Sequence, residues 1–417
     1  MSKNISVIGC GHVGSVVAAC LAGLGNQVTV VDTSEEKIKR MNARVSPVLE
    51  AGLEEILSRV NLKGTSDYSQ TGESEIVFIC VSTPSNDDGS ICLDHVVEAA
   101  RQIAFVLKEK RGYCVIAVKS SVVPGTTGDV VIPILESSGR KAGVDFGICM
   151  IPEFLREGCG VLDFMKPARI VIGEYDRRSG EALCDLYRGF EAPIVRVNLK
   201  TAEMIKYASN AFLSTKVSFI NEIGNICKRL GIDTYEVAKG MALDERIGGK
   251  YLNAGIGFSG SCLPKDLKAL IVRARQVGYE PRILEQVLQL NQSQALNVVD
   301  LLKKHVSLGG KTIGVLGLSS KPENDNVRDS LAVTIINKLL KEGVRVKAYD
   351  PRAMSNLDGL FPHVECATSE EVLGCDAVVI LTEWEEFEHL DYRGKIVIDG
   401  RRVLKAKEAR IYEGICW

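Results

Sequence analysis

One cysteine stands in a setting that can make its thiol reactive. In "GFSGSCLPKD", residues 257–266, Cys262 follows a glycine-rich turn, and Pro264 suits the first turn of a helix because its missing N–H would be unpaired there anyway. A helix starting here places Cys262 just outside its N-terminus and beside Lys265, and both features favour the thiolate form. Asp266, four residues further, could face the same way. We therefore predict that Cys262 is a nucleophile.

The other cysteines set the background against which Cys262 is judged. The chain has thirteen, an odd number at wide spacings without a Cys-x-x-Cys pair, which predicts neither a disulfide framework nor a thiolate zinc site. Cys20, Cys80, Cys114 and Cys227 lie in apolar runs and are predicted to be small core residues. The five histidines are scattered without ligand spacing, so we predict no metal.

Two further patterns could stabilise charge during a reaction. Lys206 and Asn210 stand four residues apart in a predicted helix and so share one face, where an ammonium and an amide can hold an oxyanion. A solvated helix face has the same pattern, so this reading stays open. Glu153, among Ile151, Pro152 and apolar neighbours in "IPEFLREG", is either desolvated and able to act as a base or merely exposed.

The segment "GCGHVG", residues 9–14, predicts a dinucleotide site. It follows a predicted strand and opens a predicted helix, as the G-x-G-x-x-G pattern of Gly9, Gly11 and Gly14 requires. Asp32 closes the next strand, where a carboxylate can accept a hydrogen bond from a ribose 2′-hydroxyl and would repel a 2′-phosphate. The combination predicts NAD as the cofactor, in preference to NADP.

A cysteine nucleophile combined with NAD implies a particular order of steps. A thiolate captures an aldehyde as a thiohemiacetal, which surrenders a hydride to NAD to give a thioester, and water then releases an acid. These residues do not say where the aldehyde comes from.

Composition limits the partners. With 417 residues, 46% hydrophobic and 25% charged, the chain is long enough for two or three domains, and its formal charge of −2 gives no electrostatic case for nucleic acid or an anionic membrane. The N-terminus enters a strand at once, without a signal peptide pattern, and no apolar run is long enough to span a bilayer. We expect a cytoplasmic protein whose partners are small molecules and copies of itself.

The order of predicted elements gives the fold class. Strands and helices alternate in the first segment, residues 201–230 read as one long helix without proline and with glycine only at Gly224, and the alternation returns after about residue 310. We predict an α/β protein with two Rossmann-like doubly wound domains joined by a central helical domain. The predicted boundaries are 1–200 for cofactor binding, 201–305 for the helical dimerisation and catalytic domain, and 306–417 for a C-terminal domain.

These motifs, in this order, resemble the UDP-glucose/GDP-mannose 6-dehydrogenase family nearly end to end. The resemblance is carried by "GCGHVG", "PEFLREG", "AEMIKYASNAFLSTKVSFINE", "DERIGGKYLNAGIGFSGSCLPKD", "GVLGLSSKP" and "YDP". It implies that one active site oxidises C6 of a nucleotide sugar twice, consuming two NAD, that the C-terminal domain binds the nucleotide of the sugar, and that the protein is a homodimer or a higher homo-oligomer.

The resemblance also implies roles for single residues. Cys262 would form the thioester, Lys206 and Asn210 would stabilise oxyanions, Asp266 would assist proton transfer, and Glu153 would activate the hydrolytic water. The residues implied around NAD are Gly9, Gly11, Val13, Gly14, Asp32, Lys37, Thr83, Ser121, Glu157, Lys265 and Arg328. Those implied around the substrate are Phe154, Leu155, Arg246, Tyr251, Asn253, Gly257, Lys321 and Arg401.

Some positions depart from the family pattern without removing a catalytic group. Ile151 replaces asparagine, Ser259 a glycine, Ser121 a threonine and Ser320 a phenylalanine; "NDN" at residues 324–326 replaces "TDD". Ser259 adds a side chain where backbone could pack against sugar, so it could alter affinity.

The choice of sugar rests on segments that point in two directions. "DERIGGKYLNAGIGF", "TEW" and "DGRRVL" are similar to UDP-glucose enzymes, whereas "KAGVDFG", "VVPGTT" and "EGICW" are similar to the GDP-mannose branch. The first set lies where substrate would bind, so we predict UDP-glucose, with GDP-mannose as the alternative. A two-electron hydroxyacid dehydrogenase and a catalytically silent nucleotide-sugar binding protein remain as further alternatives, less favoured than both.

Overall fold

The computed structural model describes residues 2–357 and 360–417 and divides the chain into two compact units. The first unit ends at Ser209 and the second begins at Asn210, within one long helix, α8 (Leu199–Leu230). No described helix combines the length and apolar character that crossing a bilayer requires.

The first unit is built on an eight-stranded sheet in the order β3-β2-β1-β4-β5-β6-β7-β8. The first six strands are parallel, β7 runs antiparallel to β6, and β8 is parallel to β7. The strands are β1 (Asn4–Ile8), β2 (Gln27–Val31), β3 (Leu62–Thr65), β4 (Ile76–Ile79), β5 (Val115–Val118), β6 (Gly147–Met150), β7 (Ile170–Glu174) and β8 (Ile194–Asn198).

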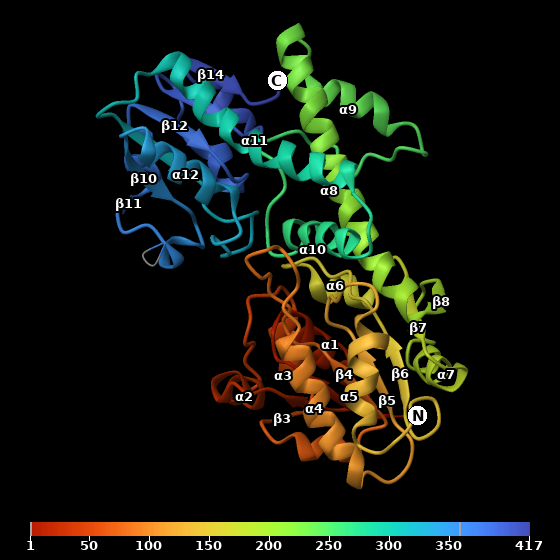
Figure 1. Ribbon diagram of the computed structural model, residues 1–417. Coiled ribbons are helices and arrows are strands. Elements are labelled where there is room, and N and C mark those ends of the chain that lie inside the picture. Colours follow the sequence, from red (N-terminus) through yellow and green to blue (C-terminus); the bar gives the residue numbers. More distant parts are fainter. Residues whose placement is uncertain (1, 358–359) are drawn as a thin grey trace. The chain divides into compact units, whose positions relative to one another are not determined.

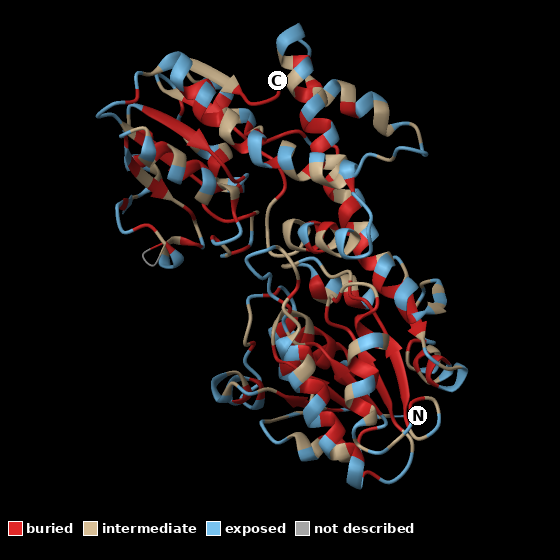
Figure 2. Cartoon of the chain, viewed as in Figure 1, coloured by how far each residue is buried: buried red, intermediate tan, exposed pale blue. Residues whose placement is uncertain are grey.

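Two apolar cores cover the two faces of this sheet because side chains alternate along each strand. Ile5 and Val7 belong to a core with the first helix of the chain, whereas Ile8 belongs to the core on the opposite face. Figure 1 shows helices on both faces, and Figure 2 shows the central strands of the sheet almost entirely buried. The helices are α1 (His12–Gly23), α2 (Glu35–Asn42), α3 (Leu53–Arg59), α4 (Asp94–Glu109), α5 (Ile132–Glu136), α6 (Gly160–Met165) and α7 (Arg177–Leu186); the short turns are η1 (Tyr68–Glu73) and η2 (Thr127–Val131).

The second unit begins with helices and ends with a parallel sheet. Its six strands have the order β11-β10-β9-β12-β13-β14, which repeats the 3-2-1-4-5-6 order of a doubly wound fold. The strands are β9 (Thr312–Leu316), β10 (Arg345–Tyr349), β11 (Val364–Cys366), β12 (Ala377–Ile380), β13 (Ile396–Asp399) and β14 (Ile411–Gly414). The helices after α8 are α9 (Thr234–Ala242), α10 (Leu263–Gln276), α11 (Arg282–His305), α12 (Leu331–Lys341) and α13 (Ser369–Leu373), with short turns η3 (Met354–Asn356), η4 (Glu385–His389) and η5 (Leu404–Glu408).

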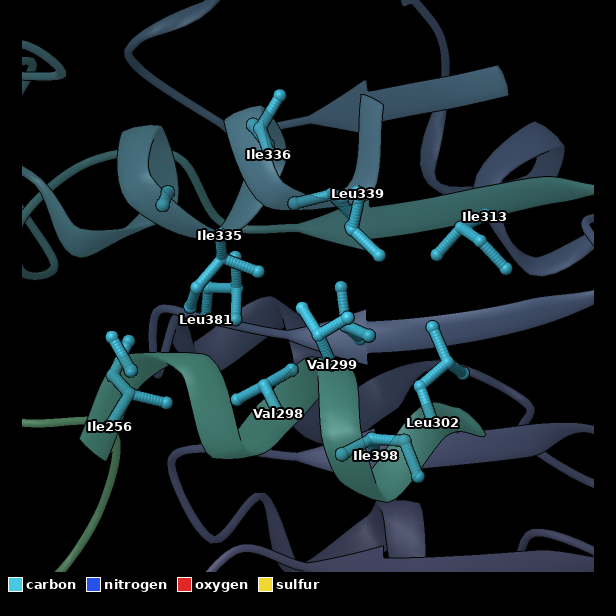
Figure 3. Packing of buried hydrophobic residues seen from close by; sticks show 14 of the residues in the cluster. Ile256, Val298, Val299, Leu302, Ile313, Ile335, Ile336, Leu339, Leu381 and Ile398 are labelled. Atoms are coloured by element: carbon cyan, nitrogen blue, oxygen red, sulfur yellow. The ribbon is translucent and has the colours of Figure 1, made fainter. Parts of the chain in front are cut away.

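One large core of the second unit joins α11 and α12 to the second sheet. Figure 3 shows Val298, Val299 and Leu302 of α11 together with Ile335, Ile336 and Leu339 of α12 and strand residues including Ile313 and Ile398. Ile256, from the irregular segment before Cys262, belongs to the same core. The segment that leads to the candidate nucleophile is therefore anchored by its own apolar side chain.

The predicted fold class is confirmed by the two sheet orders and by the strand-free run of helices between them. The long helix predicted over 201–230 is present as α8 and begins two residues earlier. The three-domain boundaries stay a proposal. The helices of the predicted central domain, 201–305, extend from the start of α8 at Leu199 to the end of α11 at His305.

Candidate functional site

The loop between β1 and α1 has the geometry of a dinucleotide-binding turn. Gly9 has a φ of +99°, and a Cβ placed there would lie 2.7 Å from the Cys80 carbonyl oxygen. A Cβ on Gly14 would lie 1.8 Å from the Gly9 oxygen, so both positions require glycine. Gly11, the N-cap of α1, faces open space, and no side chain caps the helix. The first N–H groups of α1 can therefore donate hydrogen bonds to a pyrophosphate, and the loop fits NAD.

Asp32 follows β2 and keeps bonding capacity for a ribose. Its Oδ1 accepts a hydrogen bond from the Ser34 N–H at 2.8 Å, and its Oδ2 accepts one from the Cys10 N–H of the glycine loop. The side chain is only partly buried, and two carboxylate oxygens can accept about four hydrogen bonds. The remaining acceptor positions suit a 2′-hydroxyl.

The other residues predicted around the cofactor divide between the units. In the first unit, Thr83 and Ser121 follow β4 and β5, at the same carboxyl edge of the sheet as the glycine loop, and the Thr83 hydroxyl donates to the Ser121 carbonyl at 3.0 Å. Also in this unit are Val13 and Lys37, on α1 and α2, and Glu157, in the loop before α6. The second unit holds Lys265, in the first turn of α10, and Arg328, in the loop before α12.

A buried ion pair stands at the carboxyl edge of the first sheet. The Lys206 ammonium lies 2.7 Å from Glu153 Oε1, with side chains 4% and 6% exposed. Burial alone would raise the pKa of Glu153, but Lys206, a hydrogen bond from the Leu155 N–H and the more distant Lys119 together lower it. Glu153 is thus buried and ionised, which resolves the two readings of the sequence in favour of a desolvated carboxylate.

Two residues implied to hold substrate follow Glu153 directly. The ring of Phe154 lies under the Arg169 guanidinium, 3.8 Å from ring centroid to Cζ, and the Lys206 ammonium is 5.6 Å from the same ring. Arg169 also donates to the Ser209 hydroxyl at 3.1 Å. Phe154 and Leu155 are partly buried. The aromatic face is thereby fixed beside the ion pair of the same unit.

Cys262 is the N-cap residue of α10, as predicted. The helix begins at Leu263 with Pro264 in its first turn, and the Cys262 carbonyl accepts the hydrogen bond from the Asp266 N–H at 2.9 Å. The thiol is half-buried and lies 3.6 Å from the Ser261 hydroxyl. In contrast, burial raises the pKa of Cys20 and Cys80 to about 12, so these thiols are chemically quiet.

Asp266 is held between two donors of the second unit. The Asn210 amide donates to Asp266 Oδ2 at 2.7 Å, and the Lys265 ammonium lies 2.8 Å from Asp266 Oδ1. Asp266 is 1% exposed and Asn210 is 7% exposed. Lys206 and Asn210 are both buried, one turn apart on α8. The helix face that they share therefore points inward and is not solvated.

The segment 257–260 is tied to the loop that precedes α12. The Ser259 hydroxyl donates to the Ser320 carbonyl at 3.3 Å, and the Gly260 N–H donates to the Asp329 carbonyl at 2.9 Å. Two of the positions that depart from the family pattern thus contact each other. The side chain of Ser259 is used within the protein instead of being left to meet a sugar.

Arg401 is oriented by a buried carboxylate at the end of β13. Asp399 Oδ1 accepts the N–H groups of Arg401 and Arg402, and its Oδ2 accepts the Tyr412 hydroxyl. Burial raises the pKa of Asp399 to about 6. The Arg401 side chain donates to the Leu381 carbonyl at 2.9 Å and lies 3.3 Å from Glu383.

The remaining residues implied around substrate are more exposed. Arg246 pairs with the nearby Asp244 and its side chain is 89% exposed. Tyr251 has a φ of +64° and is 37% exposed; Asn253 is exposed, and Lys321 is partly buried in the loop before α12. The structure places all of these residues in the second unit but gives none of them a role.

The second sheet differs from the first in the aspartate that follows its second strand. Asp350 stands after β10 as Asp32 stands after β2, but it is 1% exposed. Six donors fill it: the N–H groups of Leu318, Ser319, Arg352 and Ala353, the Ser319 hydroxyl and the Trp384 indole. Its carboxylate is not available to a ribose, so any nucleotide bound here is recognised differently.

Several buried residues that sequence reasoning missed support the predicted ones. Lys119, 5% exposed after β5, acts on Glu153, and burial lowers its pKa. The Glu203 carboxylate of α8 accepts the N–H groups of Gly125 and Thr127 at 2.6 and 2.7 Å. The one sequence signal for Lys119 and Glu203 is a charged residue beside apolar ones. Their partners lie far away in sequence, so the contacts themselves could not be predicted. Among the described residues, no cluster of three or more His, Cys, Asp or Glu side chains could hold a metal ion.

Comparisons with known proteins cover nearly the whole chain. Three models of the UDP-glucose/GDP-mannose dehydrogenase family match: the NAD binding domain at residues 3–191, the central domain at 200–293 and the UDP binding domain at 314–406. The chain is 41% identical to a UDP-glucose 6-dehydrogenase of Haloferax volcanii, over 99% of this chain and 100% of that protein. It is 38% identical to a GDP-mannose 6-dehydrogenase of Pseudomonas syringae, with the same coverage.

A solved structure agrees with the fold. The UDP-glucose dehydrogenase of Pyrobaculum islandicum superimposes with a TM-score of 0.97 at 40% identity, covering 100% of this chain and 98% of that one. The family model for residues 3–191 describes an NAD binding domain, the glycine loop and Asp32 fit that dinucleotide, and NAD is the cofactor. The matches to all three domains show that the chain belongs to the UDP-glucose/GDP-mannose dehydrogenase family.

Proposed function

We propose that the protein is an NAD-dependent dehydrogenase that oxidises C6 of UDP-glucose twice, from alcohol through aldehyde to acid, giving UDP-glucuronate. The observation that carries this proposal is the agreement over nearly the whole chain, at 40–41% identity, with two UDP-glucose dehydrogenases. GDP-mannose enzymes match almost as well at 38%, but they are not better supported.

The first oxidation needs a base for the C6 hydroxyl and a partner for its developing charge. The glycine loop and Asp32 would hold NAD, which would supply the hydride acceptor, with one NAD consumed in each of the two oxidations. Lys206 and Asn210 stabilise the negative charge on O6, and a water held by Asp266 takes the proton. Lys206 can do this because its ammonium is already desolvated, so no solvent must be removed when it turns to the substrate.

The second oxidation runs through Cys262. The thiolate forms a bond to C6 of the aldehyde, C6 loses its second hydride, and the product of this step is a thioester. Glu153 removes a proton from water, which attacks the thioester carbonyl and releases the carboxylate and the thiol. The lowered pKa of Glu153 keeps its carboxylate ionised, so an unprotonated oxygen is available to this water.

We assign the nucleotide contacts by resemblance. For NAD the assigned residues are Gly9, Gly11, Val13, Gly14, Asp32, Lys37, Thr83, Ser121, Glu157, Lys265 and Arg328. For the sugar nucleotide they are Phe154, Leu155, Arg246, Tyr251, Asn253, Gly257, Lys321 and Arg401. The open Gly11 and the partly buried Asp32 support the first set most directly.

The decisive experiment compares the protein with a Cys262→Ser variant. Each is incubated with NAD and either UDP-glucose or GDP-mannose, and NADH and sugar acid are measured. We expect two NADH per UDP-glucose from the unaltered protein. The variant should bind the sugar nucleotide but form no acid, because a serine hydroxyl at neutral pH is a far poorer nucleophile than a thiolate.

A second cysteine supplies the matched control. Cys375 is also partly buried in the second unit, and its thiol donates a hydrogen bond to the Glu371 carbonyl. Cys375→Ser should leave acid formation unchanged. One NADH per sugar, or undiminished acid from Cys262→Ser, would reject the mechanism. Faster turnover of GDP-mannose would reject the choice of sugar.

We also propose a homodimer that assembles through α8 and works in the cytoplasm. Phe212, Phe219 and Ile226 recur every seven residues on α8, so they share one face, and they are 64%, 46% and 49% exposed. Such a stripe of large apolar side chains is typical of an interface between copies.

A further inference from the structure

The segment that leads to Cys262 is buried but has no regular secondary structure. Residues 254–258 are all buried, and they belong to neither a helix nor a strand. Buried backbone N–H and C=O groups outside helices and sheets still need partners, because an unpaired buried polar group destabilises the folded state. At Gly255 and Phe258 the partners are side chains.

Amides of two helices supply these partners. The Asn221 Oδ1 of α8 accepts the Gly255 N–H at 2.8 Å, and the Gln294 Nε2 of α11 donates to the Gly255 carbonyl at 2.9 Å. One turn earlier on α11, Asn291 Oδ1 accepts the Phe258 N–H at 2.7 Å while its Nδ2 donates to the Phe258 carbonyl at 2.9 Å. The three amides thus pair with the segment as a neighbouring strand would.

The network fixes the orientation of each amide. Gln294 Oε1 accepts from the Asn225 and Asn297 amides at 2.8 and 3.1 Å, so its Nε2 must face Gly255. Asn291 can satisfy both the donor and the acceptor of Phe258 in only one orientation. Asn221, Asn291 and Gln294 are 0%, 4% and 1% exposed, so water does not compete for these bonds.

The glycines of the segment are required by these contacts. A Cβ on Gly257 would lie 2.4 Å from Asn291 Oδ1, and one on Gly255 would lie 2.7 Å from the Gly400 carbonyl oxygen. Gly400 in turn directly precedes Arg401. The amides therefore hold the backbone of Gly255, which packs closely against the loop that carries Arg401, another residue implied to bind substrate.

We propose that Asn291, assisted by Asn221 and Gln294, is a positioning residue for the thioester step. The amides fix the backbone at Gly255 and Phe258, the loop before α12 fixes it at Ser259 and Gly260, and Cys262 follows two residues later as the N-cap of α10. The amides act on the thiol through the chain, because their bonds go to the backbone of Gly255 and Phe258. This inference rests on the proposed function, because it concerns the position of the proposed nucleophile.

The test removes the two Phe258 bonds while leaving the volume nearly unchanged. In Asn291→Leu the side chain has a similar size but no polar atom. We expect kcat for acid formation to fall about 100-fold, as a displaced reacting group does. The KM for UDP-glucose should rise because Gly257 shifts, whereas the Kd for NAD, measured by titration without turnover, should not change. The rate of Cys262 alkylation by iodoacetamide should change as well.

Two subtler variants keep the proposal testable if Asn291→Leu fails to fold. Asn291→Asp keeps the acceptor for the Phe258 N–H but loses the donor to its carbonyl. Gln294→Glu keeps the acceptor for Asn225 and Asn297 but loses the donor to Gly255. Each should show a smaller effect on kcat and on the alkylation rate than Asn291→Leu.

A core variant on the same helix controls for stability. Val298 is fully buried two turns further along α11, and Val298→Ala should lower the melting temperature without changing the KM or the alkylation rate. If Asn291→Leu folds and matches the unaltered protein in kcat and alkylation rate, the proposal is overturned. An unaltered protein that forms no acid would overturn the proposed function instead, and the alkylation comparison would still test the positioning.

Discussion

Lys206 and Glu153 form a buried pair whose members have separate tasks in the proposed reaction. While Lys206 turns to the substrate oxyanion, Glu153 must remain ionised in a site that is almost closed to water. Lys119 is placed to help, because its charge also lowers the pKa of Glu153. When Lys206 interacts with the substrate oxyanion, the positive charge of Lys119 still stabilises the ionised Glu153 carboxylate.

Removal of Lys206 is predicted to cost both activity and stability. In Lys206→Met the Glu153 carboxylate loses its partner at 2.7 Å, and breaking a buried pair from one side typically costs about 3–5 kcal/mol of unfolding free energy. Acid formation should fall by about 100-fold or more, the usual loss for an oxyanion partner. Denaturant unfolding and NADH release measure the two effects.

A double variant separates the two effects of this change. Adding Glu153→Gln to Lys206→Met removes the uncompensated charge, so it should restore much of the lost stability and none of the activity. A double variant as unstable as Lys206→Met alone would show that the pair is not the source of the loss.

Single residues also show where sequence reasoning reaches its limit. The place of Cys262 and Pro264 at the start of α10 was predictable, because the pattern that indicates it lies within a few residues of chain. Lys119, Arg169 and Asn291 were not, because each acts on a partner that only folding brings close: Glu153, Phe154 and the backbone of Phe258. For the same reason the exposure of Glu153 stayed open until its partner was placed.

At the scale of elements, most helices and strands were predictable and the edge of the first sheet was not. The continuous apolar runs of β4, β5 and β12 identify strands buried on both faces. β8 has the sequence "IVRVN" with two partly buried and three exposed residues, and β7 reverses the direction of the sheet. The run 254–258 forms neither element, and at Gly255 and Phe258 side-chain amides bond to its backbone.

The connection from β13 to β14 carries the clearest pH dependence. Asp399 ends β13, and burial raises its pKa from the usual 3.8 to about 6. A carboxyl whose pKa is raised on folding contributes its stability below about pH 4, and this contribution is lost as the pH rises through about 6. The shift of roughly two pKa units corresponds to about 3 kcal/mol.

Asp399→Asn is predicted to remove this dependence. Compared with the unaltered protein, the variant should gain relative stability between pH 4 and pH 6, because an amide never has to ionise in the buried site. Urea unfolding of both proteins at several pH values measures the difference, and the contributions of all other carboxyl groups cancel. A difference that stays constant from pH 4 to pH 7 would contradict the assignment.

At the scale of the whole molecule, the proposed dimer rests on the exposed face of α8. Phe219→Asp places a charge in the middle of the apolar stripe, so it should shift the protein from dimer to monomer in size-exclusion chromatography with light scattering. Phe105 on α4 is 71% exposed outside this face, and Phe105→Asp is the matched control. If the unaltered protein, Phe219→Asp and Phe105→Asp have equal masses, the apolar stripe on α8 is not the dimer interface.

The two sheets share a strand order but differ in the use of one carboxylate. Asp32 keeps acceptor positions open, whereas the corresponding Asp350 is filled by six donors of its own unit. This difference could not be predicted from the matching endings "VTVVD" and "VKAYD". The matching strand endings indicate the shared fold. Whether the aspartate can bind a ribose depends on neighbouring loops, whose N–H and side-chain donors are not part of the repeat.

The boundary between the two units falls inside α8, between Ser209 and Asn210, and therefore between Lys206 and Asn210. A chain cut at this boundary would leave one proposed oxyanion partner on each fragment and expose two frayed helix ends. Chimaeras that exchange parts among relatives should therefore join the parents before Leu199 or after Leu230. For protein engineering, α8 is an indivisible part of the enzyme rather than a linker.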